Sequence, residues 1–98
     1  MTIEKNINGS EMIVALTGRL DTTTSPQLEA EFKKSIDGVD CLILDFKNLE
    51  YLSSAGLRVL LAAQKVMNKQ GKMVIRNVND TISEVFEITG FGDILTIE

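Results

Sequence analysis

Apolar and polar residues follow two patterns along the chain, one typical of strands and one typical of helices. The segments TIEKNI (2–7) and MIVALTG (12–18) are rich in residues that favour strands, and they flank Asn8-Gly9, a dipeptide that favours hairpin turns. They predict an N-terminal hairpin, with a connection that we expect to be longer than two residues. CLILDF (41–46) is a nearly unbroken apolar run, which indicates a strand buried on both faces in a parallel sheet.

Between these strands the apolar period changes to that of an α-helix. Leu28, Phe32 and Ile36 recur every four residues, and the positions between them are mostly charged or polar. Thr24 or Ser25 is suited to be the N-cap of this helix, because a proline follows that is tolerated in a first turn. The pattern predicts an amphipathic helix on the surface of the domain.

A second helix is predicted after the apolar strand. It begins near Ser53 or Ser54 and continues to about Gln70, where Gly71 is placed to end it. Its first turns are apolar almost all round, so we expect it to pack into the body of the domain. The next segment, KMVIRNV (72–78), has the composition of another strand.

The last part of the chain predicts a short helix and a closing strand. NDTISEVFEITG (79–90) has Thr81 and Glu84 at the spacing of a capping box, and DILTIE (93–98) is expected to complete the sheet. The predicted order is β-β-α-β-α-β-α-β in a single domain, residues 1–98. Strand-helix-strand connections favour parallel pairing, so we expect an α/β fold whose mixed, mainly parallel sheet starts with the hairpin and carries the helices packed on it.

Charge and length narrow the possible partners. The chain has 98 residues and a formal charge of −4, from fourteen acidic and ten basic residues, and the basic residues are scattered. A nucleic-acid partner is not expected, because such binding needs clustered positive charge. No apolar stretch approaches the roughly 18 to 20 residues of a membrane span, and the N-terminus lacks a secretory apolar region, so we expect a cytoplasmic protein with no membrane partner.

The residue types available also restrict the chemistry. The chain contains no histidine, the commonest general base and transition-metal ligand, and its only cysteine, Cys41, falls in an apolar run and is expected in the core. A Ser-His-Asp triad or a zinc site of Cys and His ligands cannot be assembled. We therefore expect no metal, no cofactor and no enzymatic activity.

The segment YLSSAGLRVLL (51–61) is the strongest candidate for a functional site. It places two hydroxyls at the start of the middle helix, where loops after parallel strands commonly form binding sites. One interpretation is helix capping alone. A second is an anion site, although the glycine-rich spacing and lysine of a phosphate-binding loop are missing. In a third, another protein phosphorylates one of the serines.

Three stretches of the chain resemble the STAS domain family, which includes bacterial anti-sigma factor antagonists. LILDFKNLEYLSSAGLRVLL (42–61) is similar to the family's central motif, in which an apolar strand leads to D-S-[ST]-G-L. LTGRLD (16–21) resembles its G-x-L-D segment, and EITGFGDILTI (87–97) resembles its T-G-hydrophobic ending. The resemblance spans nearly the whole chain in the same order, and it implies the same succession of strands and helices as the patterns above.

The resemblance implies roles for particular residues. Ser54 aligns with the serine that a partner kinase phosphorylates, while Ser53 replaces the family's Asp and is the alternative acceptor. Ala55 replaces the family's second Ser or Thr. Asp21 matches the Asp of the G-x-L-D segment at the partner-binding end, although a plain turn residue explains it equally well. The partner-binding residues predicted in this way are Asp21, Ser53, Ser54, Ala55, Gly56 and Arg58.

The function that the resemblance implies is a switchable protein interaction. The unphosphorylated chain would bind an anti-sigma factor with serine-kinase activity and so free a sigma factor, phosphorylation at Ser54 would end binding, and a serine phosphatase would restore it. The alternative is a STAS adaptor or structural module that binds without phosphorylation, within a larger signalling or transport complex. Two other functions are disfavoured: a phosphoaccepting receiver domain built on Asp45 lacks the required acidic pair and lysine, and an enzyme acting through the serines lacks a base.

Overall fold

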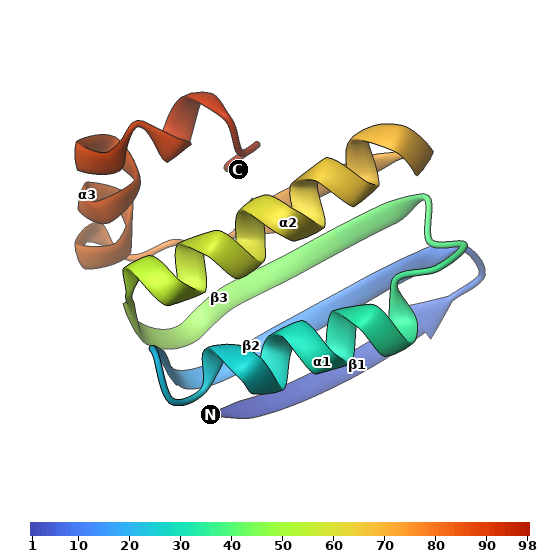
Figure 1. The fold of residues 1–98 in the computed structure, drawn as a ribbon, viewed down its shortest axis with the longest axis horizontal. Helices are drawn as coiled ribbons and strands as arrows, with labels where there is room; N and C mark the ends of the chain where they lie inside the picture. The colour runs from blue at the N-terminus through green and yellow to red at the C-terminus, as the bar shows by residue number, and fades with distance from the viewer.

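The chain folds into a sheet with helices on one face. The computed structural model describes residues 1–98 and contains four strands in the order β1-β2-β3-β4. Two helices, α1 and α2, lie side by side across one face of the sheet, and α3 lies at the end of the sheet where α2 begins (Figure 1). The elements are β1 Thr2–Asn8, β2 Glu11–Leu20, α1 Ser25–Ser35, β3 Cys41–Leu52, α2 Ser54–Gln70, β4 Lys72–Arg76, α3 Asp80–Thr89 and the 3₁₀ turn η1 Phe91–Asp93.

The topology follows from the handedness of the connections. β1 and β2 pair antiparallel, whereas β2 with β3 and β3 with β4 pair parallel, each pair being joined through a helix. Because both crossovers are expected to be right-handed and each moves to the next strand in the same direction, α1 and α2 share one face. The predicted α/β class and mixed, mainly parallel sheet are confirmed.

The N-terminal hairpin is tighter than expected. Asn8 pairs directly with Glu11, so the connection is the two residues Gly9 and Ser10, and the expectation of a longer connection is wrong. Gly9 has φ of 64° and Ser10 is not among the residues with positive φ, which is the pattern of a two-residue turn with glycine first. The two turn residues are therefore Gly9 and Ser10, and Asn8 is the last residue of β1.

Alternation along the strands fills the layer between sheet and helices. Met12, Val14 and Leu16 of β2 are buried beneath the helices and belong to a core of 23 residues. The apolar run of β3 is buried on both faces, as expected, but helices cover only one of them. Ile43 on the other face is 5% exposed and lies outside the main core, flanked by strand neighbours. Cys41, expected in the core, is only half-buried.

β3 is longer than its apolar sequence indicates. The prediction ended this strand near Phe46, yet it continues through KNLEYL to Leu52. After an irregularity in register beyond Ala15, its second half pairs with Thr17–Leu20 of β2. A second irregularity falls between Gly18 and Arg19, and Gly18 has φ of 102°. Pairing with a neighbouring strand thus overrides the polar local sequence. This extension brings the start of α2 next to the end of β2.

The helix boundaries agree with the local signals, except for one cap. α1 has Thr24 as N-cap and α2 has Ser53, as the sequence predicted. The expected capping box of α3 at Thr81 and Glu84 is wrong, because the N-cap is Asn79. Its side-chain oxygen accepts a hydrogen bond from the backbone N–H of Ile82 at 2.8 Å. Its amide also donates to the carbonyl of Leu49 at 3.0 Å, which ties α3 to β3.

The segment expected to form a closing strand contributes a single bridge. Ile97 pairs in parallel with Ile75, supported by backbone bonds from Ile75 to Thr96 and from Glu98 to Ile75 at 2.9 and 2.8 Å. The 3₁₀ turn ends at Asp93, the first residue that the prediction gave to the strand. No helix has the length and apolar composition needed to cross a membrane.

The first turn of α2 packs against the ends of two strands, and Gly56 makes the close approach possible. A Cβ placed on Gly56 would lie 2.7 Å from Cδ1 of Leu52 and 2.8 Å from Cγ of Leu20, closer than van der Waals contact allows. Both leucines are buried. The glycine thus fixes how near the helix start lies to β2 and β3.

We therefore expect Gly56→Ala to lower the free energy of unfolding by about 1 to 3 kcal/mol, through overpacking that displaces the first turn of α2. Urea denaturation followed by circular dichroism measures this. Gly92→Ala is the matched control, because its added Cβ would meet only the carbonyl oxygen of Phe86 at 3.9 Å. Equal stability of the Gly56→Ala protein and the wild type would contradict the close-packing argument.

Candidate functional site

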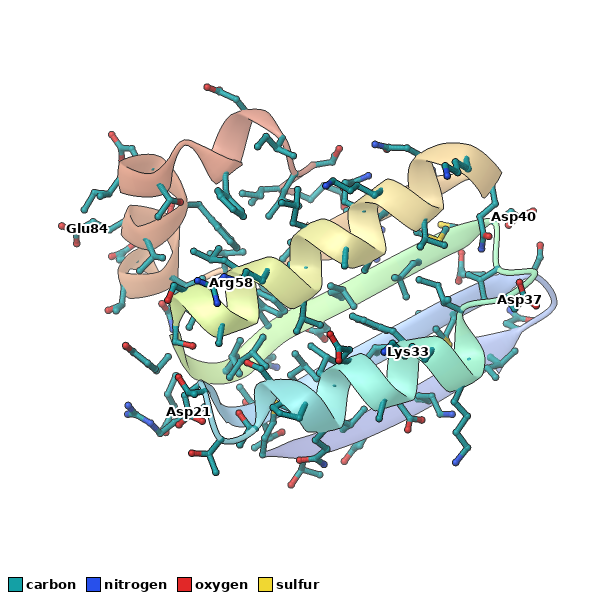
Figure 2. The ribbon with its side chains drawn as sticks, viewed as in Figure 1. Asp21, Lys33, Asp37, Asp40, Arg58 and Glu84 are labelled. Carbon is teal, nitrogen blue, oxygen red and sulfur yellow. The ribbon has the colours of Figure 1, made fainter.

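The predicted site residues gather at the end of the sheet where α1 and α2 begin. Asp21 follows β2 directly, and Ser53 lies between β3 and α2. The backbone N–H of Ser53 donates to the carbonyl of Leu20 at 2.9 Å, which joins the two loops. Figure 2 shows Asp21 near the start of α1 and Arg58 on the first turns of α2, both at this end. The carboxyl ends of parallel strands are the usual place for a binding site in such sheets.

The two serines have different structural roles. Ser53 is the N-cap of α2, and its hydroxyl accepts a hydrogen bond from the backbone N–H of Gly56 at 3.3 Å. It is half-buried. Ser54 is the first residue of the helix, is exposed, and its hydroxyl takes no part in the cap. The capping interpretation therefore applies to Ser53, and Ser54 has its hydroxyl available to another molecule.

Asp21 organises the loop between β2 and α1. Its carboxylate accepts hydrogen bonds from the backbone N–H groups of Thr23 and Thr24 at 3.0 and 3.1 Å. Its carbonyl accepts from the buried Ser25, both from the backbone N–H at 2.8 Å and from the hydroxyl at 2.5 Å. The N–H of Thr24, followed by the other Thr23 and Thr24 donors and the charge of Arg19, holds the pKa of Asp21 below its usual value. The turn interpretation of Asp21 is thus supported by its contacts.

An aromatic and cationic pair lies beside this loop, and sequence reasoning missed it. The guanidinium of Arg19 is 4.4 Å from the ring centroid of Tyr51, in cation–π contact, and its Nε is 3.7 Å from a carboxylate oxygen of Asp21. Arg19 and Tyr51 are paired across β2 and β3. The signal that would have identified the pair is this strand register, which lies in the extended part of β3 that the sequence did not predict.

The remaining predicted residues surround the start of α2. All three are residues of α2: Gly56 is buried, Ala55 is half-buried, and Arg58 is exposed. Ala55 and Arg58 line a shallow groove between the first turns of α1 and α2. The other lining residues are Thr22, Ser25, Pro26, Glu29 and Val59. The structure therefore brings all six predicted partner-binding residues to one end of the molecule, with Asp21 after β2, Ser53 at the cap of α2 and the others on α2.

Asp45 lies apart from these residues and has a structural role. Its carboxylate accepts hydrogen bonds from the side-chain amide of Asn77 at 2.9 Å and from the backbone N–H of Lys47 at 3.0 Å. The Asn77 bond is the main reason that the pKa of Asp45 is lowered. Asn77 has a φ of 61°, a conformation that asparagine tolerates better than most residues. Asp45 is thus a hydrogen-bonding residue within β3. No group of three or more acidic or cysteine side chains is arranged to hold a metal ion.

The different roles of the serines predict different effects on stability. Ser53→Ala removes the cap of α2 and should lower the free energy of unfolding by about 1 kcal/mol. Ser54→Ala should change it by less than about 0.5 kcal/mol, because an exposed side chain is replaced by a good helix former. Urea denaturation of both variants side by side measures the difference. A larger loss for Ser54→Ala than for Ser53→Ala would contradict the assignment of the cap.

The hydrogen bonds to Asp21 predict a dependence of stability on pH. Because its pKa is lower in the folded state, its stabilisation is complete above the unfolded value, near 4, and is lost as the pH falls through the folded value. Asp21→Asn should therefore lower the melting temperature at pH 7, and the difference from wild type should shrink as the pH is lowered toward about 2. Asp37→Asn, at an exposed position outside the ion pairs, is the control. A difference that stays constant with pH would contradict the role given to the Asp21 carboxylate.

Comparison with known sequences extends over the whole chain. The STAS domain family matches residues 2–98. The protein BtrV of Bordetella bronchiseptica, which carries the name of an anti-sigma factor antagonist, is 39% identical over 99% of this chain and 84% of its own length. The anti-sigma F factor antagonist of Paenibacillus polymyxa is 31% identical over 99% of this chain and 86% of its own length.

Solved structures share the fold. An anti-sigma factor antagonist from Mycobacterium paratuberculosis superimposes with a TM-score of 0.88 at 22% identity, covering 98% of this chain and 83% of that one. The anti-sigma factor antagonist SpoIIAA in its unphosphorylated form superimposes with a TM-score of 0.78 at 21% identity, covering 99% and 87%. With the family match over residues 2–98 and relatives above 30% identity along the whole chain, this protein belongs to the STAS domain family.

Proposed function

We propose that the chain is an anti-sigma factor antagonist that phosphorylation of Ser54 switches off. The names of the BtrV and Paenibacillus relatives support the general function. The observation that supports the switch is the exposed position of Ser54 on the first turn of α2, outside the hydrogen bond that caps the helix. In this proposal the unmodified chain binds an anti-sigma factor that is also a serine kinase, and a sigma factor is released.

Ser54 is a better acceptor than Ser53 for a structural reason. The Ser53 hydroxyl is engaged with the N–H of Gly56 in a half-buried cap, so its modification would cost the helix its cap. The Ser54 hydroxyl can be modified without breaking a hydrogen bond of the cap. The replacement of the family's Asp by Ser53 keeps the cap but removes a negative charge beside the acceptor. Any kinase acting here must therefore recognise Ser54 without that carboxylate.

The fold is expected to tolerate a phosphate at Ser54. A phosphoserine carries a charge of about −1.5 to −2 near neutral pH. At a helix N-terminus this charge is stabilising by about 0.3 to 1 kcal/mol, because it faces the positive end of the helix dipole. The first turn of α2 contains no acidic residue that would oppose it. Modification should therefore leave the architecture intact.

Binding responds in the opposite direction. At an interface the phosphate loses its hydration, and without a complementary group on the partner such a mismatch costs about 2 to 5 kcal/mol. That corresponds to a loss in affinity of roughly 30-fold to a few thousand-fold. Because the cost falls on association and hardly on folding, one group acts as a switch. A serine phosphatase acting on the same exposed position would restore the binding form.

A STAS adaptor that binds without phosphorylation is the second candidate, and the replacement of the family's Asp by Ser53 favours it. In that case both serines serve only the helix start. Incubation with a partner kinase and ATP separates the two functions. One added phosphate that Ser54→Ala abolishes and Ser53→Ala leaves intact supports the switch, and an unchanged mass of the wild type supports the adaptor.

The proposed switch predicts the behaviour of a charge mimic. Ser54→Asp should weaken binding to an anti-sigma factor with serine-kinase activity from the same organism by at least about tenfold, since even a mismatch of about 1.4 kcal/mol has that effect. Isothermal titration calorimetry measures the affinity, and thermal unfolding of the same sample should stay within a few degrees of wild type. Ser54→Asn is the matched control and should bind within a few-fold of wild type. Equal affinities of the Asp and Asn variants would contradict the proposal.

A further inference from the structure

Arg58 is an unpaired cation one helical turn beyond Ser54. It is exposed on α2, and the four ion pairs of the chain use Lys5, Arg19, Lys33 and Arg76 but not Arg58. The acid that lines the same groove as Arg58 is Glu29 of α1, and its carboxylate is paired with Lys33 at 3.7 Å. Arg58 therefore has no anionic partner in the unmodified chain.

Helix geometry places this cation within reach of the hydroxyl of Ser54. Residues four apart on an α-helix are neighbours on the same face, with Cβ atoms about 5 to 6 Å apart. Side chains on a helix also incline toward its N-terminus, so the Arg58 guanidinium extends back toward the first turn. Both residues lie within α2, Ser54–Gln70, whose start is held by the Ser53 cap and by the packing of Gly56.

We propose that Arg58 binds the phosphate of phosphorylated Ser54 within the same chain, an inference that rests on the proposed function. The planar guanidinium donates two parallel hydrogen bonds to phosphate oxygens, a geometry that a lysine does not offer. The rigid start of the helix holds both groups at the required spacing. The anion is the modified side chain itself, and no separate ligand is needed.

This pairing adds a second element to the switch. In the unmodified chain the Arg58 side chain is free at the groove between α1 and α2, next to Ala55. After modification the phosphate holds the guanidinium on the first turn of α2. One phosphorylation then adds an anion to the start of α2 and also withdraws the guanidinium from the groove, so a partner that contacts this end meets a different arrangement of charge.

The titration of the phosphate tests the pairing without any partner protein. Phosphoserine is installed at position 54 during translation, and the second pKa of the phosphate is followed by ³¹P NMR in the wild type and in Arg58→Gln. Loss of the guanidinium should increase the proton affinity of the phosphate about twofold or more, because the dianion loses its cation. Arg58→Lys should give an intermediate value. The acids Asp21 and Glu29 at this end of the molecule, and Glu50 near the end of β3, are present in every variant and cancel in the comparison.

Lys65→Gln is the matched control, because it removes one positive charge from an exposed position of α2 two turns further along. It should leave the proton affinity of the phosphate nearly unchanged. Equal values for the wild type and Arg58→Gln, or an equal effect of Lys65→Gln, would overturn the pairing. In the phosphorylated wild type, the Nε–H resonance of Arg58 should also move as the phosphate titrates, and a resonance that stays fixed would overturn it as well. Since no kinase or anti-sigma factor is present, this result is separate from the fate of the proposed function.

Discussion

The packing of the first turn of α2 against the ends of β2 and β3 is the constraint on which the site depends. Gly56 lets the helix approach the side chains of Leu20 and Leu52 more closely than any larger residue would allow. Two hydrogen bonds hold the same turn. The N–H of Ser53 donates to the carbonyl of Leu20, and the hydroxyl of Ser53 accepts from the N–H of Gly56. Together they determine which serine faces the fold and which faces solvent.

In the proposed switch, this arrangement separates stability from regulation within two adjacent residues. Ser53 caps the helix, so charge can be added at Ser54 without loss of the cap. The positive end of the helix accommodates an anion, while a docked partner would have to desolvate it. Arg58 is unpaired and lies one turn away, where the proposed pairing would bind the added phosphate. Asp21, by contrast, is engaged with its own loop, and its contacts explain its presence without a partner.

Local sequence signals predicted what local physics controls. The apolar periods identified the helices, and the serines and Gly71 placed the ends of α2 at the observed positions. Features that depend on distant pairing were not predictable in this way. β3 continues through polar residues to Leu52 because β2 lies beside it, and the bond from the Asn79 amide to the carbonyl of Leu49 joins residues thirty positions apart. The cation–π pair of Arg19 and Tyr51 depends on the same strand extension.

The central claim is that negative charge on Ser54 acts on association and leaves folding intact. The most direct test compares fully phosphorylated and unmodified protein in two measurements, the affinity for the anti-sigma kinase and the free energy of unfolding in urea. The account predicts an affinity at least about 30-fold weaker after phosphorylation, with unfolding free energies within about 1 kcal/mol of each other. Equal affinities, or a phosphorylated chain that loses binding because it unfolds, would contradict it.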